Sequence, residues 1–186
     1  KDLDLPGREE AAANIRIGID FLASVAFEHT ESVGEKVLVI GGGNTAMDCC
    51  RTALRLGADE VKVVVRSPFA DMKASPWEKE DTLHEGIAIH DNHSPKEFVI
   101  ENGKLVAMRF EIMEARYDEN GKRSLIATGE VVTFECDDVL MAIGQENSFP
   151  WIERDLGVEF GEWDMPVVDK KTFQSTCPNI FFGGDA

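Results

Sequence analysis

A short apolar run that ends in three glycines constrains the fold of this chain most. Lys36–Ile40 reads Lys-Val-Leu-Val-Ile, and glycines occupy positions 41–43 directly after it. Residues 44–56 then have helical periodicity, which Gly57 stops. A buried strand, a glycine turn and a helix in this order predict the first part of a β-α-β unit, and the apolar run at residues 61–65 supplies its second strand.

The segments around this unit predict an α/β domain. Residues 14–27 have apolar side chains at steps of three and four, which predicts an amphipathic helix. Ser75, as N-cap before Pro76, opens another expected helix that ends near residue 85. Apolar runs at residues 87–89, 138–143 and 180–182 predict further strands. Because near-continuous Val, Ile and Leu runs indicate strands covered on both faces, the sheet should be parallel.

A different pattern interrupts this domain between residues 96 and 135. Three extended stretches, at 97–101, 105–116 and 130–135, are separated by Asn102-Gly103 and by the polar turn 118–121. Both connections are hairpin signals. The predicted fold class is therefore α/β, a Rossmann-like parallel sheet with an inserted three-stranded antiparallel β-meander.

Charge and composition narrow the classes of partner. A net charge of −16 argues against a nucleic-acid-binding surface. The apolar runs are too short to span a membrane, and residues 1–4 contain no signal-peptide core, so we expect a cytoplasmic protein without a membrane partner. None of the four cysteines forms a C-x-x-C motif, which disfavours thiol-disulfide reduction and a zinc site. His90 and His93 are expected in a surface loop and not at a metal.

The glycine turn has the spacing of a dinucleotide-binding site. Gly41 permits a tight turn, Gly43 lets the backbone approach a pyrophosphate, and Ala46 allows close contact between helix and strand. The N-terminus of the following helix offers free N–H groups and a partial positive charge, so the anionic ligand needs no basic patch. Without this context, a glycine run is equally well explained as a turn. The expected pyrophosphate-binding residues are Gly41, Gly42, Gly43, Asn44, Thr45 and Ala46.

The end of the second strand indicates which coenzyme is bound. NAD-preferring domains usually have an acidic residue there, whereas this strand is followed by Arg66 and Ser67. Arg66 can hold a 2′-phosphate and Ser67 can donate a further hydrogen bond, so NADP(H) is favoured and NAD(H) is the alternative. A solvated surface arginine is the competing interpretation. The strand at 138–143 ends in a glycine, at Ala142-Ile143-Gly144. Small residues at such a strand end let backbone lie against a ligand, or this is an ordinary turn.

Several blocks together resemble one family. The most specific is Gly41-Gly-Gly-Asn-Thr-Ala-Met-Asp48, and the others are residues 51–58, 65–66, 142–145 and 183–185. They resemble the NADPH-dependent glutamate synthase small subunit and related flavoproteins of the pyridine nucleotide-disulfide oxidoreductase superfamily. The resemblance extends from residue 5 to residue 186. Two departures bear on the coenzyme: Ser67 stands where close members often have a second arginine, and Met72-Lys73-Ala74 stands in place of Met-Pro-Ala.

The resemblance implies an enzyme whose parts lie partly outside this chain. NAD(P)H would lie across residues 43–46 and Arg66, with residues 142–144 near the nicotinamide, and would pass hydride to FAD. Gly184 and Asp185 would belong to the FAD site, where the aspartate contacts the ribityl chain. Residues 1–186 would form a single NAD(P)H-binding domain of a larger flavoprotein, in which residues 1–13 lead from the FAD domain and residues 176–186 return to it. The expected partners are this FAD domain and an iron–sulfur or catalytic subunit.

Two other functions use the same fold. A non-catalytic dinucleotide-sensing module is the main alternative, although a sensor does not need the flavin motif at residues 183–185. A self-sufficient short-chain dehydrogenase would need Tyr-x-x-x-Lys, yet Tyr117 is followed by Gly121 at that spacing. Because the flavin performs the hydride chemistry, we expect no catalytic acid or base, and the isolated chain should be inactive.

Overall fold

The computed structural model describes residues 3–117, 119, 123–144 and 149–183. The chain divides into two compact units, Lys1–Gly144 and Gln145–Ala186, which are described separately. Within the described residues, the helices are too short or too polar to cross a bilayer.

A five-stranded parallel sheet forms the middle of the first unit, in the order β1-β8-β2-β3-β4. Its central strand, β2, pairs in parallel with β3 on one side and with β8 on the other. Four of the five residues of β2 and all of β8 are buried, as continuous apolar runs in a covered sheet should be. The strands are β1 (Ile15–Ile17), β2 (Lys36–Ile40), β3 (Glu60–Val64), β4 (Ala88–His90) and β8 (Asp138–Met141).

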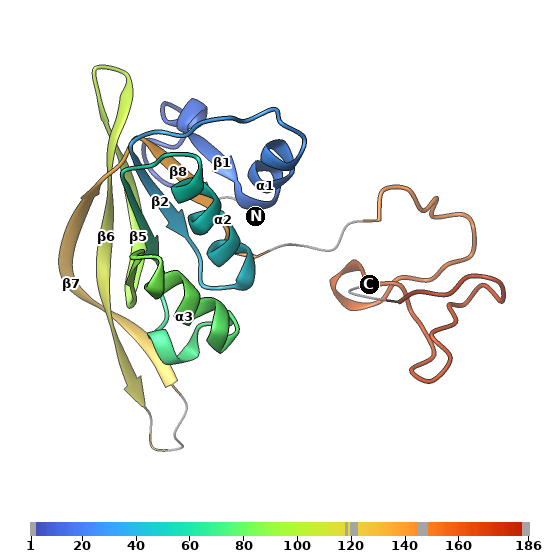
Figure 1. Cartoon of the computed structure of the whole chain (residues 1–186). Coiled ribbons are helices and arrows are strands. Elements are labelled where there is room, and N and C mark those ends of the chain that lie inside the picture. The colour runs from blue at the N-terminus through green and yellow to red at the C-terminus, as the bar shows by residue number, and fades with distance from the viewer. Residues whose placement is uncertain (1–2, 118, 120–122, 145–148, 184–186) are drawn as a thin grey trace. The chain divides into compact units, whose positions relative to one another are not determined.

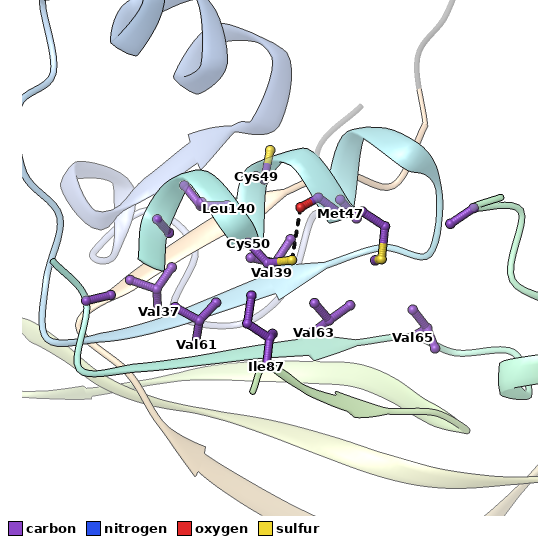
Figure 2. Close-up of a cluster of buried hydrophobic side chains, with 14 of the residues drawn as sticks. Val37, Val39, Met47, Cys49, Cys50, Val61, Val63, Val65, Ile87 and Leu140 are labelled. Atoms are coloured by element: carbon purple, nitrogen blue, oxygen red, sulfur yellow. Dashed lines mark hydrogen bonds between the residues drawn. The ribbon is translucent and has the colours of Figure 1, made fainter. Parts of the chain in front are cut away.

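Three helices cover one face of this sheet (Figure 1). They are α1 (Gly18–Ala26), α2 (Asn44–Arg55) and α3 (Pro76–His84). Figure 2 shows α2 lying over Val37, Val39, Val61 and Val63, whose side chains point toward it from β2 and β3. The opposite face of α2 is polar, so burial of one apolar side against the valines is what holds this helix in place.

The predicted antiparallel meander covers the other face. It consists of β5 (His93–Glu101), β6 (Lys104–Tyr117) and β7 (Arg123–Glu135), paired in that order. Leu38 and Ile40, which alternate with the helix-facing valines along β2, pack with Met108 and Phe110 of β6. Helices, parallel sheet and meander thus form three layers (Figure 1), and the predicted α/β fold class is confirmed. Most of the polar turn predicted at 118–121 lies outside the described residues.

The start of the chain differs from the prediction. The helix expected at residues 14–27 begins only at Gly18, after a 3-10 turn at Ala12–Asn14, because residues 15–17 form β1 instead. In this strand Ile15 pairs with Val139 and Ile17 with Met141 of β8. The side chain of Ile15 thereby enters the core on the meander side. Pairing with a strand more than a hundred residues away therefore overrides the local helical periodicity.

The second unit has little regular structure. Its described residues contain a 3-10 helix at Glu162–Asp164 and isolated bridges, one of which joins Gln174 and Phe181. The strand expected at residues 180–182 is therefore reduced to a single bridge. A small core of Phe149, Ile152, Val158 and Phe182 supports this unit.

Candidate functional site: the carboxyl ends of the central strands

Three strands end side by side at one edge of the parallel sheet. Ile40, the last residue of β2, pairs with Val64 at the end of β3 and with Met141 at the end of β8. The chain segments that follow, at residues 41, 65 and 142, therefore leave the sheet next to one another. Because β3 and β4 lie on one side of β2 and β8 and β1 on the other, this edge is also the topological switch point of the sheet. Ligands of open α/β sheets bind at such a point.

Gly41 makes the contact between two of these ends. Its φ is 141°, and a Cβ atom there would lie 2.2 Å from the carbonyl oxygen of Ala142. The backbone N–H of Gly41 donates to Val64 at 3.0 Å, and that of Ala142 donates to Ile40 at 2.8 Å. The tight turn expected at Gly41 is thus present, and packing of the strand ends excludes a side chain.

Gly43 has the opposite surroundings. It is the N-cap of α2 with an ordinary φ of −100°, and a Cβ atom there would meet no protein atom within 4 Å. In the described chain, the first turn of α2 carries neither an acidic residue nor a side-chain cap. The Ala46 N–H donates to the Gly43 carbonyl at 3.0 Å, whereas the N–H groups of Asn44 and Thr45 have no acceptor among the described residues. These two N–H groups are available to an anion, next to backbone that a ligand can approach closely. Ala46 is fully buried at the start of α2, as the predicted helix–strand contact requires.

Arg66 and Ser67 leave the end of β3 beside this turn. Val65 is held on both sides, since its N–H donates to the His90 carbonyl and its own carbonyl accepts from the His93 N–H, both at 2.9 Å. The next side chain, Arg66, is exposed and forms no ion pair or hydrogen bond with the residues that the structure describes. A free guanidinium group on a fixed backbone position is what recognition of a phosphate needs.

Two hydrogen bonds connect the segment after β3 to the glycine turn. The N–H of Ala74 donates to the Gly42 carbonyl, and the N–H of Ser75 donates to Oδ1 of Asn44, each at 2.9 Å. Met72 is buried beside Gly42. Ser75 is the N-cap of α3, as predicted, although its hydroxyl makes no capping hydrogen bond. These contacts join residues that are far apart in the sequence, so no local sequence pattern predicts them.

Ion pairs connect the acidic helix α3 to α2. Arg51 of α2 donates to Glu85 at 2.7 Å and to Glu78 at 2.9 Å. Burial by itself would raise the pKa of Glu85, but hydrogen bonds from Arg51 and Arg55 hold this pKa below its ordinary value. These ion pairs fasten α3 to α2 and so support the segment that lies between β3 and α3.

The residues that follow β8 lie at the same edge of the sheet, beside those that follow β2. Ala142 contacts Gly41, Ile143 packs against the core on the meander side, and Gly144 has a φ of 107° with open space where a Cβ would stand. The predicted FAD-contacting residues Gly184 and Asp185 lie outside the described residues.

Three of the four thiols and the imidazoles of His90 and His93 pack against other side chains. Burial raises the pKa values of Cys49, Cys50 and Cys136 to about 12. His90 and His93 do not lie in a surface loop as expected, since both rings pack against Phe134 of β7, with centroids at 4.6 and 5.7 Å. Burial and, secondarily, His93 and Lys62 lower the pKa of His90. Within the described ranges, His, Cys, Asp and Glu side chains form no group of three that could hold a metal.

Curated relatives contain a similar sequence as one part of longer proteins. Subunit beta of the NADP(+)-dependent formate dehydrogenase from Moorella thermoacetica is 33% identical over 186 residues, which cover 98% of this chain and 26% of that protein. The glutamate synthase (NADPH) small chain from Halomonas elongata is 33% identical over 195 residues, which cover 98% of this chain and 40% of that protein. The chain therefore spans less than half the length of either relative.

Solved structures show the same fold at lower identity. Thioredoxin reductase from T. acidophilum matches with a TM-score of 0.71 at 19% identity, over 100% of this chain and 53% of that one. FprA from Mycobacterium tuberculosis, solved in complex with NADPH, matches with a TM-score of 0.65 at 17% identity, over 87% and 50% of the two chains. The sequence profile of the pyridine nucleotide-disulphide oxidoreductases matches residues 1–186. Because this profile covers the whole sequence, the chain belongs to the pyridine nucleotide-disulphide oxidoreductase family, as its sequence blocks predicted.

Proposed function

We propose that this chain binds NADP(H) at the carboxyl edge of its parallel sheet and positions the nicotinamide for hydride transfer to FAD. The observation that supports this most is the backbone of Gly43, which opens a space free of protein atoms at the N-terminus of α2. The glycine turn follows β2, whose end stands in register with the ends of β3 and β8 at the switch point of the sheet. Family membership and relatives named for NADPH or NADP(+) support the same conclusion.

The residues of this chain bind and orient the coenzyme. The N–H groups of Asn44 and Thr45, at the start of α2, hold the pyrophosphate, and Gly43 lets the backbone approach it. Ala142 and Gly144 present backbone to the nicotinamide, while the side chain of Ile143 packs against the core on the meander side. FAD, when bound, supplies the hydride chemistry, so this chain needs no acid or base of its own.

Arg66 accounts for the preference for NADP(H) over NAD(H). It is exposed, it has no partner among the described residues, and it follows the strand next to the glycine turn. Its guanidinium group would form a charge-assisted hydrogen bond with the 2′-phosphate, with Ser67 beside it. No acidic residue stands at this end of β3 to bind the 2′-hydroxyl of NAD(H).

The same proposal extends to the whole protein. Residues 1–186 would act as the NAD(P)H-binding domain, with residues 1–13 and 176–186 connecting it to an FAD domain in the cytoplasm. Electrons would pass from FAD to iron–sulfur clusters or a partner subunit. In support, one relative is named as subunit beta of a formate dehydrogenase and another as subunit beta of an NADPH-Fe(3+) oxidoreductase.

Calorimetric titration of NADP+ and NAD+ into the 186-residue chain tests the binding site. A methyl group at Gly43 would intrude on the pyrophosphate, and overpacking of this kind costs about 1–3 kcal/mol. Gly43→Ala should therefore weaken both coenzymes about tenfold to a hundredfold, and Gly43→Val should abolish binding. Gly161→Ala is the matched control, because this N-cap also has a φ of −100° and room for a Cβ. Full affinity in Gly43→Val would place the dinucleotide elsewhere.

The same titration tests the coenzyme preference. Arg66→Ala should weaken NADP+ about tenfold to a hundredfold and leave NAD+ nearly unchanged, since a hydrogen bond to a charged group contributes about 1.5–3 kcal/mol. Arg116→Ala, which removes an exposed arginine from β6, is the control. Equal losses for both coenzymes would remove Arg66 from the 2′-phosphate site.

A further inference from the structure

The segment that carries Arg66 is anchored at both of its ends. This segment, residues 65–75, connects β3 to α3 and is called the Arg66 segment below. Its first residue, Val65, is hydrogen-bonded to His90 and His93, and its N–H at Phe69 donates to Oδ2 of Asp91 at 2.7 Å. Its last two residues are bonded to the glycine turn. The distance between Arg66 and the turn is therefore set by specific bonds at both ends of the segment.

Two groups on the glycine turn accept hydrogen bonds from the Arg66 segment, and the amide oxygen of Asn44 is the side-chain group of these two. The other acceptor is the backbone carbonyl of Gly42, which no substitution removes. A backbone N–H can bond only to an acceptor, so the amide oxygen of Asn44 faces Ser75 and its NH2 group is directed away. Asn44 is also the first residue of α2, next to the proposed pyrophosphate site. Its side chain thus links the two parts of the proposed coenzyme site.

We propose that Asn44 is a positioning residue for coenzyme selectivity, because its side chain ties the Arg66 segment to the glycine turn. The inference rests on the proposed function, in which the turn holds the pyrophosphate and Arg66 holds the 2′-phosphate of the same molecule. These two groups must stand at a fixed separation to bind one ligand. When the tie is broken, Arg66 loses its defined position. Binding of NADP(H) then weakens more than binding of NAD(H), which has no 2′-phosphate, so the ratio of the two affinities falls.

Two substitutions break this hydrogen bond from opposite sides. Asn44→Ala removes the acceptor. Ser75→Pro removes the N–H donor at a position whose φ of −61° already suits proline, and it leaves the glycine turn unaltered. Asn44→Asp is the control, because its carboxylate still accepts a hydrogen bond from the Ser75 N–H. Its added negative charge beside the pyrophosphate should weaken both coenzymes alike.

The readout is the ratio of NADP+ affinity to NAD+ affinity, measured by calorimetry on the 186-residue chain. Asn44→Ala and Ser75→Pro should each lower this ratio about threefold to tenfold, the factor expected for one ordinary hydrogen bond. The double variant should lower it no further than either single one. Asn44→Asp should keep the wild-type ratio. In an Arg66→Ala background, Asn44→Ala should leave the ratio unchanged, because the group through which it acts is absent.

The possible failures are distinguishable. If Arg66→Ala lowers the ratio but Asn44→Ala and Ser75→Pro weaken both coenzymes equally, the positioning role is wrong and the proposed coenzyme site stands. If Asn44→Ala still lowers the ratio without Arg66, Asn44 acts by another route and the inference is overturned. If Arg66→Ala itself leaves the ratio unchanged, the 2′-phosphate assignment and the positioning role fall together.

Discussion

Replacement of Gly41 by alanine should destabilise the chain far more than the same change two residues later. The new Cβ would lie 2.2 Å from the carbonyl oxygen and 2.6 Å from the carbonyl carbon of Ala142. Neither strand end can move away freely, since the Ala142 N–H is bonded to Ile40 and the Gly41 N–H to Val64. The φ of 141° adds backbone strain that alanine does not tolerate.

The magnitude follows from these two terms. Strained backbone costs about 1–3 kcal/mol and overpacking about 1–3 kcal/mol, so we expect a loss near 4 kcal/mol. In a chain of this length each kcal/mol lowers the melting temperature by about 2–4 °C, which gives a fall of roughly 8–16 °C. Gly43→Ala meets no protein atom and has an ordinary φ. It should change stability by less than about 1 kcal/mol, because the lower entropy of the unfolded chain offsets the weaker preference of alanine for an N-cap position.

Thermal and urea unfolding followed by circular dichroism measures both variants. The two variants should differ in which property they lose. Gly41→Ala loses stability, whereas Gly43→Ala keeps stability and loses coenzyme affinity. A difference of about 2 °C in melting temperature corresponds to a stability change of roughly 0.5–1 kcal/mol. If Gly41→Ala melts within this range of the wild type, the strand ends relax and packing does not require a glycine at position 41. Equal destabilisation by both variants would show that the two glycines do not have separate roles.

Two further predictions concern the helical layer and the thiols. Glu85 has a pKa lowered by its arginine partners, so its contribution to stability is present at neutral pH and is lost as pH falls through the folded-state pKa. Arg51→Met should therefore destabilise the chain by about 1–2 kcal/mol at pH 7 and by clearly less at pH 3 in urea titrations, and an equal difference at both pH values would contradict this ion pair. In the folded chain at pH 8, a chromogenic disulfide reagent should label Cys177 first and the other thiols only after unfolding, and prompt labelling of a second thiol would refute the burial argument. The three thiols expected to be protected are Cys49, Cys50 and Cys136.

The central unit of the fold was predictable because its signals are local. The apolar run of β2 is followed directly by the glycines and by the helical periodicity of α2. A glycine allows a turn through the conformational freedom of its own backbone. The meander was predictable for the same reason, since Asn102-Gly103 marks a turn between neighbouring strands. The expected roles of Gly41 and Ala46 as tight turn and helix–strand contact needed no knowledge of distant residues.

Other features depend on residues that only folding brings together. The segment at residues 15–17 has the periodicity of a helix but becomes β1, because a place beside β8 buries Ile15 in the core. The ion pairs of Arg51 require α2 and α3 to pack side by side, although the sequence shows only an acidic helix.

The sequence by itself determined the strand–glycine–helix unit, the layer of antiparallel strands and the family, because these depend on side-chain periodicity and on the backbone freedom of single residues. Only the tertiary structure decided that the ends of β2, β3 and β8 stand in register, and that Asn44 holds the Arg66 segment. The physical reason is that hydrogen bonds and close contacts form between atoms that are near in space. Ala142 follows Gly41 by 101 positions in the sequence, yet its carbonyl oxygen leaves no room there for a side chain.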